Sequence, residues 1–319
     1  MRLAVFGAGA VGAYLGSRFA LAGADVHLVA RGPHLEALKR DGLTVVGPDG
    51  TSTLRLPATD DPREIGHVDF VLFCVKSYDT NAAASQLPPL IGSTTAVVSL
   101  QNGIENEPRI AAVVGEDHVL GGAAYILAAI EAPGVVRSGS ARIVVGELRP
   151  GPPSARVETF VEAARAGGVD ATAAVDVRIA KWEKYVLLVA FSAVSAATQL
   201  PLGDIRRSSA AVDMLKAVMT EAATVGRALD VPLADDLVER QAALVLAQAE
   251  NEGTSLRHDL LTGHRMEVEV LQGTLSRLGR EVGIPTPWSD AAYAILQPWA
   301  IRNERLTAER TDRAPILST

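Results

Sequence analysis

The stretch "MRLAVFGAGAVGAYLGSRFALAGADVHLVAR", residues 1–31, decides the fold of this chain. It begins with a short apolar segment, 3–6, which predicts a buried strand. A glycine-rich turn follows, and then an alanine-rich segment that predicts a helix to about Leu21, ended by Gly23. The apolar segment 26–30 predicts a second strand. Strand, helix and strand in this order form a βαβ unit, in which the two strands are parallel.

The turn in this unit matches the pattern G-x-G-x-x-G, which is typical of dinucleotide binding when it joins a strand to a helix. Its residues are Gly7, Ala8, Gly9, Ala10, Val11 and Gly12. The first glycine permits the tight turn, the second lets the backbone approach a pyrophosphate, and the third lets the helix pack closely on the strand. The alternative is a glycine-rich turn that binds nothing. In this context we predict a cofactor site.

Arg31 follows the second predicted strand, where an NAD-binding protein often carries Asp or Glu. A guanidinium at this place favours a 2′-phosphate, so the sequence predicts NADP(H) as the cofactor. The alternative for Arg31 is an ordinary surface arginine.

Further strands are predicted at 70–75, 96–100 and 118–123, and the continuous apolar runs of the first two suit a parallel sheet that is buried on both faces. Lys76 and Asn102 come just past the first two of these strands. Ligands bind at the carboxyl ends of parallel strands, so both are candidates for contacts with cofactor or substrate. Two antiparallel pairs are also predicted, one at 42–56 with its turn at 48–50, and one within 134–148. Cys74 is expected inside a buried strand.

From about residue 177 the chain shows only helical patterns, at 178–199, 208–229, 234–250, 264–282 and 287–300. We therefore predict a Rossmann-type α/β domain, 1–175, followed by an all-α domain, 176–319. A cleft between two such domains is a common cofactor and substrate site. The segment 307–319 has no packing pattern and is expected to fray.

The chain has 319 residues, and 48% of them are hydrophobic, enough to bury a substantial core. Its net charge of -7 argues against a general nucleic-acid binder. Its longest uncharged apolar run is shorter than the roughly 20 residues that span a bilayer. The single cysteine cannot form an internal disulfide, so a cytoplasmic protein is expected. The histidines are scattered, and His258 and His264 fit a metal site poorly, so no metal is expected.

The segment "KWEKYVLLVAFSAVSAAT", 181–198, opens a nearly all-apolar helix with Lys184 close to its start. Glu267 lies at the edge of another apolar helical stripe, where a carboxylate needs a partner or water. From spacing alone the sequence favours a structural Lys–Glu contact, or a lysine that extends into solvent, over a catalytic role.

Several motifs together resemble the ketopantoate reductase (2-dehydropantoate 2-reductase) family. These are GAGAVG at 7–12, Arg31, "VKSYDT" at 75–80, "LQNGIEN" at 100–106, "WEKYV" at 182–186 and "SLRHDLLTGHRMEVE" at 255–269. The resemblance covers nearly the whole chain. It implies NADPH-dependent reduction of a 2-oxo acid, with ketopantoate giving pantoate in pantothenate biosynthesis. The expected partners are a small 2-oxo acid and, as an open alternative, a second copy of the chain bound through the helical domain.

Carried over by position, the resemblance implies that Lys184 is the catalytic lysine and that Glu267 supports it. It also implies that Lys76 and Asn102 contact the cofactor and active site, and that Ser255 binds the substrate. A lysine ammonium beside the reacting ketone would stabilise the developing oxyanion and donate its proton. On this reading, the amine of Lys184 and the carboxylate of Glu267 meet over the nicotinamide.

The sequence departs from the family where the family helix usually carries asparagines, four and eight residues after the lysine. Here these positions are Leu188 and Ser192, which we expect to line the substrate site and set its specificity. Asp79 stands three positions after Lys76, where family members often have a polar residue, and it is only an acceptor when ionised. Glu252 replaces another asparagine, although Asn251 is adjacent and either could line the site.

The sequence therefore leaves three functions open. The first is reduction of ketopantoate, the second is reduction of another, more apolar 2-oxo acid by a paralogue, and the third is a non-catalytic NADPH-binding regulator. Retention of Lys184, Ser255 and Glu267 favours an enzyme over a regulator.

Overall fold

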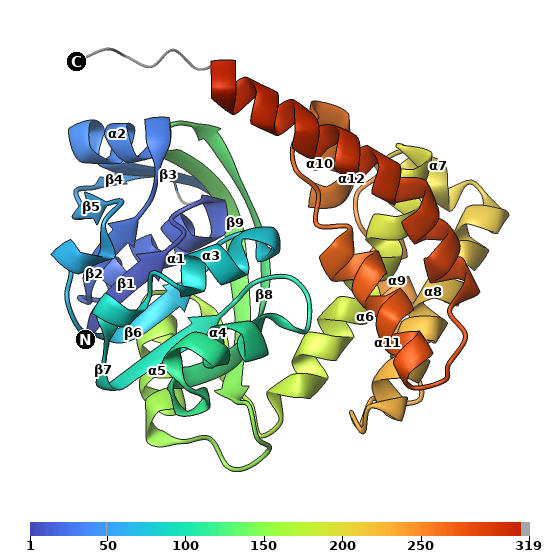
Figure 1. Cartoon of the computed structure of the whole chain (residues 1–319), viewed down its shortest axis with the longest axis horizontal. Coiled ribbons are helices and arrows are strands. Elements are labelled where there is room, and N and C mark those ends of the chain that lie inside the picture. Colours follow the sequence, from blue (N-terminus) through green and yellow to red (C-terminus); the bar gives the residue numbers. More distant parts are fainter. Residues whose placement is uncertain (49, 314–319) are drawn as a thin grey trace. The chain divides into compact units, whose positions relative to one another are not determined.

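The computed structural model describes residues 1–48 and 50–313. By its internal contacts the chain divides into two compact units, Met1–Lys181 and Trp182–Thr319. The first is an α/β unit and the second is helical (Figure 1). The assignment of cofactor binding to 1–175 and of substrate binding to 176–319 stays a prediction, since it concerns function.

The first unit is built on one sheet with the strand order β4-β3-β9-β8-β7-β6-β1-β2-β5, and β10 pairs with β9. Its strands are β1 (Arg2–Phe6), β2 (Asp25–Val29), β3 (Leu43–Gly47), β4 (Gly50–Leu54), β5 (Ala58–Thr59), β6 (Val68–Phe73), β7 (Ile91–Ser99), β8 (Val119–Ala132), β9 (Val135–Glu147) and β10 (Asp170–Ala173). The central strands β7, β6, β1 and β2 are mutually parallel, as the sequence predicts.

Helices cover both faces of this sheet (Figure 1). They are α1 (Ala10–Leu21), α2 (Gly32–Asp41), α3 (Thr80–Ala84), α4 (Asn106–Val114) and α5 (Ala155–Ala166), with short 3₁₀ turns η1 (Pro62–Glu64), η2 (Ser77–Asp79), η3 (Pro88–Leu90) and η4 (Glu116–His118). Alternate residues of a strand point to opposite faces. Leu3 and Val5 accordingly enter one apolar core, and Ala4 and Phe6 enter a second. This is why β1 reads as a continuous apolar run.

Three details differ from the sequence-based expectations. The segment 134–148 is not an antiparallel pair: it forms the single strand β9, which pairs antiparallel with β8. Strand β6 ends at Phe73, so Cys74 lies just beyond it and is half-buried. The hairpin of β3 and β4 is confirmed by its antiparallel register, and residue 49 of its turn lies outside the described residues.

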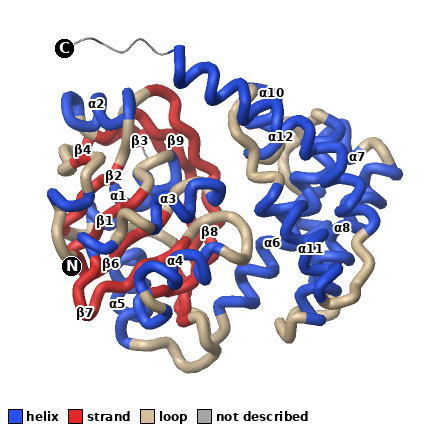
Figure 2. Tube along the Cα trace, viewed as in Figure 1, coloured by secondary structure: helices blue, strands red, loops and turns tan. Residues whose placement is uncertain are grey.

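In the described part of the second unit, 182–313, the regular elements are helices (Figure 2). They are α6 (Val177–Thr198), which begins in the first unit, α7 (Leu202–Arg206), α8 (Ser209–Ala228), α9 (Leu237–Leu246), α10 (Ser255–Thr262), the π-helical turn η5 (Glu269–Gly273), α11 (Thr274–Glu281) and α12 (Pro287–Arg313). The sequence missed α7 and α10. Helix α12 extends to Arg313, so the expected fraying was wrong for 307–313, and 314–319 lie outside the described residues.

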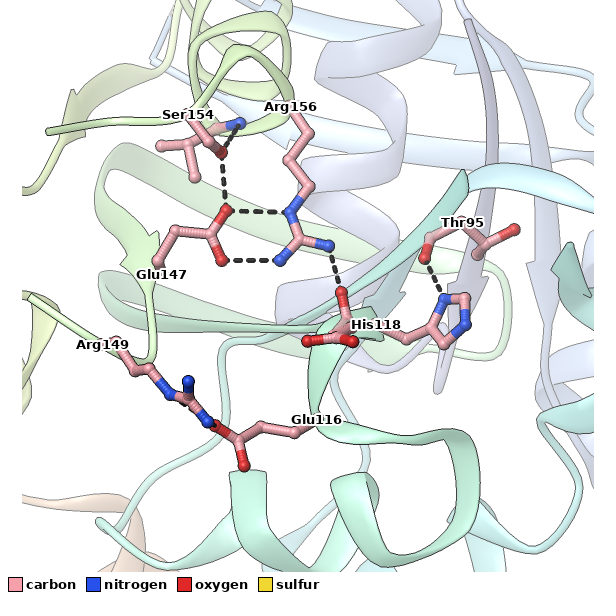
Figure 3. A network of polar contacts seen from close by, with 9 residues as sticks. Thr95, Glu116, His118, Glu147, Arg149, Ser154 and Arg156 are labelled. Carbon is pink, nitrogen blue, oxygen red and sulfur yellow. Dashed lines mark hydrogen bonds and ion pairs between the residues drawn. The ribbon is translucent and has the colours of Figure 1, made fainter. Parts of the chain in front are cut away.

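A polar network fixes the end of β9 to the start of α5 (Figure 3). Glu147 accepts hydrogen bonds from the Arg156 guanidinium at 2.6 and 2.8 Å, and from the Ser154 hydroxyl at 2.6 Å. Arg156 also donates to the main-chain oxygen of Asp117, which belongs to η4. Arginine hydrogen bonding lowers the pKa of the Glu147 carboxyl. The network therefore connects β9, α5 and η4.

Candidate active site

The glycine turn between β1 and α1 contains two positions that the fold restricts to glycine and one that it does not. Gly7 adopts a φ of +92°, and a Cβ on Gly12 would lie 2.4 Å from the Gly7 carbonyl oxygen, so both positions need glycine. A Cβ on Gly9, in contrast, would have no atom within 4 Å. Nothing in the fold itself requires glycine at this position, which leaves its backbone open to a ligand.

The first turn of α1 is also suited to an anion. It carries no acidic residue, and Gly9 at its N-cap offers no side-chain hydrogen bond to the first amides. Such amides point along the helix axis and attract negative charge. The residues of this turn therefore fit the phosphates of a dinucleotide.

The other predicted cofactor residues belong to the same edge of the sheet. Strands β2, β1, β6 and β7 are consecutive parallel neighbours, so the segments that follow them leave at a common edge. Arg31 follows β2 and is exposed, Lys76 follows β6 and is exposed, and Asn102 follows β7 and is half-buried. The topology thus gathers these segments beside the glycine turn.

Hydrogen bonds hold the Lys76 and Asn102 segments in one arrangement. The main-chain oxygen of Asn102 accepts from the Ser77 hydroxyl at 2.9 Å and from the Asn106 amide at 2.8 Å. The Thr80 hydroxyl donates to Asn106 Oδ1 at 3.1 Å. Gln101 donates to Thr80 Oγ1 at 2.8 Å and to the carbonyl of residue 75 at 2.9 Å.

Sequence reasoning missed the four side chains of this network: Ser77, Thr80, Gln101 and Asn106. All four are buried polar residues. The sequence could have indicated them by position, because each follows the end of a strand of the sheet. Buried polar side chains there can hydrogen-bond nearby backbone groups.

Arg31 has a partner that the sequence did not suggest. Its Nη2 lies 3.4 Å from Asp79 Oδ2, with Asp79 at the end of η2, the turn after β6. The Arg31 side chain is 78% exposed and that of Asp79 is 33% exposed. The cation predicted to hold a 2′-phosphate therefore already faces a carboxylate.

The second unit carries the predicted catalytic residues. Lys184 lies on α6 and is half-buried, and Glu267 comes just before η5 and is 5% exposed. Their elements are in contact, because the hydroxyl of Tyr185 donates to the Leu271 carbonyl at 2.6 Å and Gln272 donates to the Val189 carbonyl at 3.1 Å.

The sequence predicted that Glu267 lies on a helix that begins at 264. In the structure it lies instead in a stretch without regular structure. The helix starts only with the π-helical turn η5, an irregularity that often accompanies functional sites. A direct pairing of Lys184 with Glu267 stays a prediction.

The residues expected to set substrate specificity differ in exposure. Leu188 is half-buried on α6. Ser192 is 0% exposed, and its hydroxyl has no hydrogen-bond partner in the described part of the chain. Leu188 is thus the more accessible of the two positions.

Ser255 is exposed at the first position of α10. The preceding residue, Thr254, caps this helix by accepting from Arg257 N at 3.3 Å, and its hydroxyl lies 2.9 Å from that of Ser195 on α6. The region around Ser255 is therefore attached to α6. Asn251 is exposed and Glu252 is half-buried.

Within the described ranges 1–48 and 50–313, no cluster of three or more His, Cys, Asp or Glu side chains could hold a metal ion. Searched over the same residues, no helix has the length and apolar character needed to span a membrane.

Two family matches cover most of the chain. Residues 3–150 match the family described as "Ketopantoate reductase PanE/ApbA", and residues 176–300 match "Ketopantoate reductase PanE/ApbA C terminal". This chain belongs to the ketopantoate reductase family. The family consists of 2-dehydropantoate 2-reductase-like oxidoreductases, and the sequence-based recognition and fold class are confirmed.

Relatives and solved structures agree with the family match. The 2-dehydropantoate 2-reductase of Mesorhizobium japonicum is 31% identical over 94% of this chain and 98% of its own length. That of Halobacterium salinarum is 35% identical over 90% and 95%. A PanE/ApbA family ketopantoate reductase from Ralstonia eutropha superposes with a TM-score of 0.88, at 32% identity, over 95% of this chain and all of that one.

A D-mandelate dehydrogenase solved with NADH and anilino(oxo)acetate has the same fold. Its TM-score is 0.88 at 22% identity, over 95% of this chain and 99% of that one. At this identity the likeness concerns the fold alone. Family members bind NAD(P)H, so the fold is compatible with either dinucleotide.

Proposed function

We propose that this chain is an NADPH-dependent reductase that converts a 2-oxo acid into a 2-hydroxy acid, with ketopantoate as the first candidate substrate. The observation that carries the proposal is the family match over both parts of the chain, together with Lys184 in its W-x-K motif on α6. The open backbone at Gly9 supports the cofactor.

When bound, the dinucleotide supplies a hydride to the carbonyl carbon of the substrate. The residues of this chain have the remaining tasks. The turn 7–12 holds the pyrophosphate with its backbone amides, and Arg31 faces the 2′-phosphate. Lys76 and Asn102, fixed by the hydrogen bonds around η2 and α4, contact the bound cofactor.

Lys184 stabilises the negative charge that develops on the ketone oxygen and donates the proton that completes the alcohol. A lysine amine is protonated at neutral pH, because its ordinary pKa is about 10.4. A cation placed beside a developing oxyanion lowers the barrier for the reaction. Glu267 orients this amine, and Ser255 binds the substrate carboxylate or a neighbouring polar group.

A second candidate is a reductase of a more apolar 2-oxo acid, and Leu188 favours it. A leucine side chain cannot hydrogen-bond a polar substrate, and it would instead pack against an apolar one. The D-mandelate dehydrogenase with the same fold was solved with NADH and anilino(oxo)acetate, which is an oxo acid with an aromatic ring. Aromatic 2-oxo acids are therefore included in the test.

The experiment follows the loss of NADPH absorbance with purified protein, using ketopantoate and 2-oxo acids with aliphatic and aromatic side chains, and repeats the panel with NADH. Reduction of ketopantoate above the others supports the first candidate, and preference for an apolar acid supports the second. Binding of NADPH without reduction of any carbonyl acid would overturn both and favour the regulator.

A further inference from the structure

We propose that Asp79 is a determinant of coenzyme choice, and that its contact with Arg31 adapts the adenosine end of the site to NADH as well as NADPH. The inference rests on the proposed function only in taking a nicotinamide dinucleotide as the ligand. The observation behind it is the 3.4 Å separation of Arg31 Nη2 and Asp79 Oδ2.

The two residues reach each other from opposite sides of the glycine turn. Arg31 is the N-cap residue of α2, directly after β2, and Asp79 ends η2, after β6. Strand β1 lies between β2 and β6 in the sheet and leads into the turn 7–12. A dinucleotide whose pyrophosphate lies on this turn would therefore have both side chains near it.

The pair contributes little to the fold. Exposed ion pairs stabilise proteins by at most about 1 kcal/mol, and the Arg31 side chain is largely exposed. Asp79 precedes α3 without capping it through its side chain. The contact between Arg31 and Asp79 can therefore change when a ligand binds at little cost to the fold.

The charges explain the effect on ligands. A guanidinium alone favours the 2′-phosphate of NADPH, which carries close to two negative charges at neutral pH. A carboxylate within contact distance of that guanidinium repels the same phosphate and occupies one of its donors. With NADH, the carboxylate can accept hydrogen bonds from the ribose hydroxyls, as Asp or Glu does in NAD-binding folds.

Another arginine nearby does not replace Arg31 in this role. Arg63 follows β5, the neighbour of β2, but Asp61 holds it through paired hydrogen bonds at 2.7 and 2.8 Å. The Arg31–Asp79 contact is longer and is not paired in this way. A ligand can therefore rearrange it more easily, which a coenzyme-selecting pair requires.

The test compares the dissociation constants of NADPH and NADH, measured by fluorescence titration, in the full chain and in Asp79→Asn. The variant keeps the size of the side chain and removes its charge. We expect the ratio of NADPH to NADH affinity to rise about fivefold to tenfold, which is the size of one charge contact near a protein surface.

Asp25→Asn is the matched control, because Asp25 lies at the opposite end of β2 and pairs with Arg2 at 3.3 Å. It makes the same change in net charge and should leave the affinity ratio unaltered. An unchanged ratio in Asp79→Asn, or the same rise in both variants, would overturn the proposal.

The two proposals fail separately. If the ratio rises in Asp79→Asn but no 2-oxo acid is reduced, the inference stands and the proposed reaction is wrong. If a 2-oxo acid is reduced and the ratio does not move, the reaction stands and Asp79 has no part in coenzyme choice. A chain that binds neither dinucleotide contradicts both.

Discussion

Lys181 on α6 and Glu107 on α4 form an ion pair in which the side chains are only 8% and 5% exposed. Both charged groups are buried away from solvent, so each depends on the other for stabilisation. Lys181 precedes Lys184 by one turn of the same helix, and Glu107 adjoins Asn106, which bonds the Asn102 segment. Within the first unit, the pair thus joins α4 to the first turns of α6.

We expect Glu107→Gln to lower the free energy of unfolding by about 3–5 kcal/mol, because the Lys181 ammonium would remain buried without its counter-charge. Urea unfolding measures this loss. Replacing both residues, with Lys181→Met and Glu107→Leu, should recover most of it, since no buried charge remains. Glu281→Gln is the control, because its pair with Arg277 is exposed. A loss in Glu107→Gln as small as that of the control would contradict this account.

Gly9→Ala should separate ligand binding from folding. The added methyl has open space around it in the protein, so the free energy of unfolding should change by no more than about 0.5 kcal/mol. The affinity for NADPH should fall at least about tenfold, because the methyl occupies the approach of the pyrophosphate. Gly139→Ala, which also points into open space, should change neither quantity. Retained NADPH affinity in Gly9→Ala would rule out this turn as the pyrophosphate site.

The sequence alone was sufficient to predict the α/β fold of the first unit because the relevant signals are local. A strand, a glycine turn and a helix follow each other within residues 1–31, and the apolar runs of the next strands mark them as buried on both faces. The segment 134–148 was assigned wrongly because its pairing partner is β8, an upstream strand that runs on to Ala132. The strand predicted at 118–123 stops well short of the end of β8, so the turn between Ala132 and Val135 was not recognised.

The candidate site was predictable only in part, because its contacts join segments that lie far apart in the sequence. Lys184 and Glu267 were proposed by resemblance, and the hydrogen bonds of Tyr185 and Gln272 between their elements were not predicted. The Arg31–Asp79 contact joins two segments separated by a whole strand and helix. Such contacts follow from the order of strands in the sheet, which a single sequence does not state.

Acid should weaken the network of Glu147, Arg156 and Ser154. Arginine hydrogen bonding lowers the pKa of Glu147 in the folded protein below its ordinary value of 4.5, so the folded state binds a proton there less readily than the unfolded chain. The stabilisation is therefore complete above about pH 4.5 and is lost as the pH falls through the folded pKa. We expect the melting temperature of Glu147→Gln to fall less steeply below pH 4.5 than that of the unaltered chain. If the melting temperatures of the two proteins fall equally steeply below pH 4.5, Glu147 does not have this stabilising role.

Lys184→Met should abolish turnover without affecting the cofactor. General acid catalysis contributes about 10²–10⁴-fold to a rate, and the variant should lose at least this much of kcat for whichever 2-oxo acid is reduced. NADPH affinity should stay within about twofold, because the proposed cofactor contacts lie in the first unit. Lys216→Met, which removes an exposed lysine of α8, is the matched control. Full activity in Lys184→Met would exclude it as the proton donor, whereas unchanged binding with lost turnover would exclude the regulator.

Leu188→Asn should shift specificity towards polar substrates. Leu188 lies one turn beyond Lys184 on the same face of α6 and is half-buried. If Lys184 protonates the substrate as proposed, residue 188 is the nearest position on that face to contact it. An amide there can hydrogen-bond a hydroxyl of ketopantoate, and a site that hydrogen-bonds its substrate favours it over an apolar analogue. We expect the ratio of kcat/KM for ketopantoate to that for an apolar 2-oxo acid of similar size to rise about tenfold, or about 1.4 kcal/mol. Leu187→Asn, on the neighbouring position of the same helix, controls for a general effect of the amide on α6. Equal shifts in both variants would mean that residue 188 does not contact the substrate, and specificity would then have to arise elsewhere in the second unit.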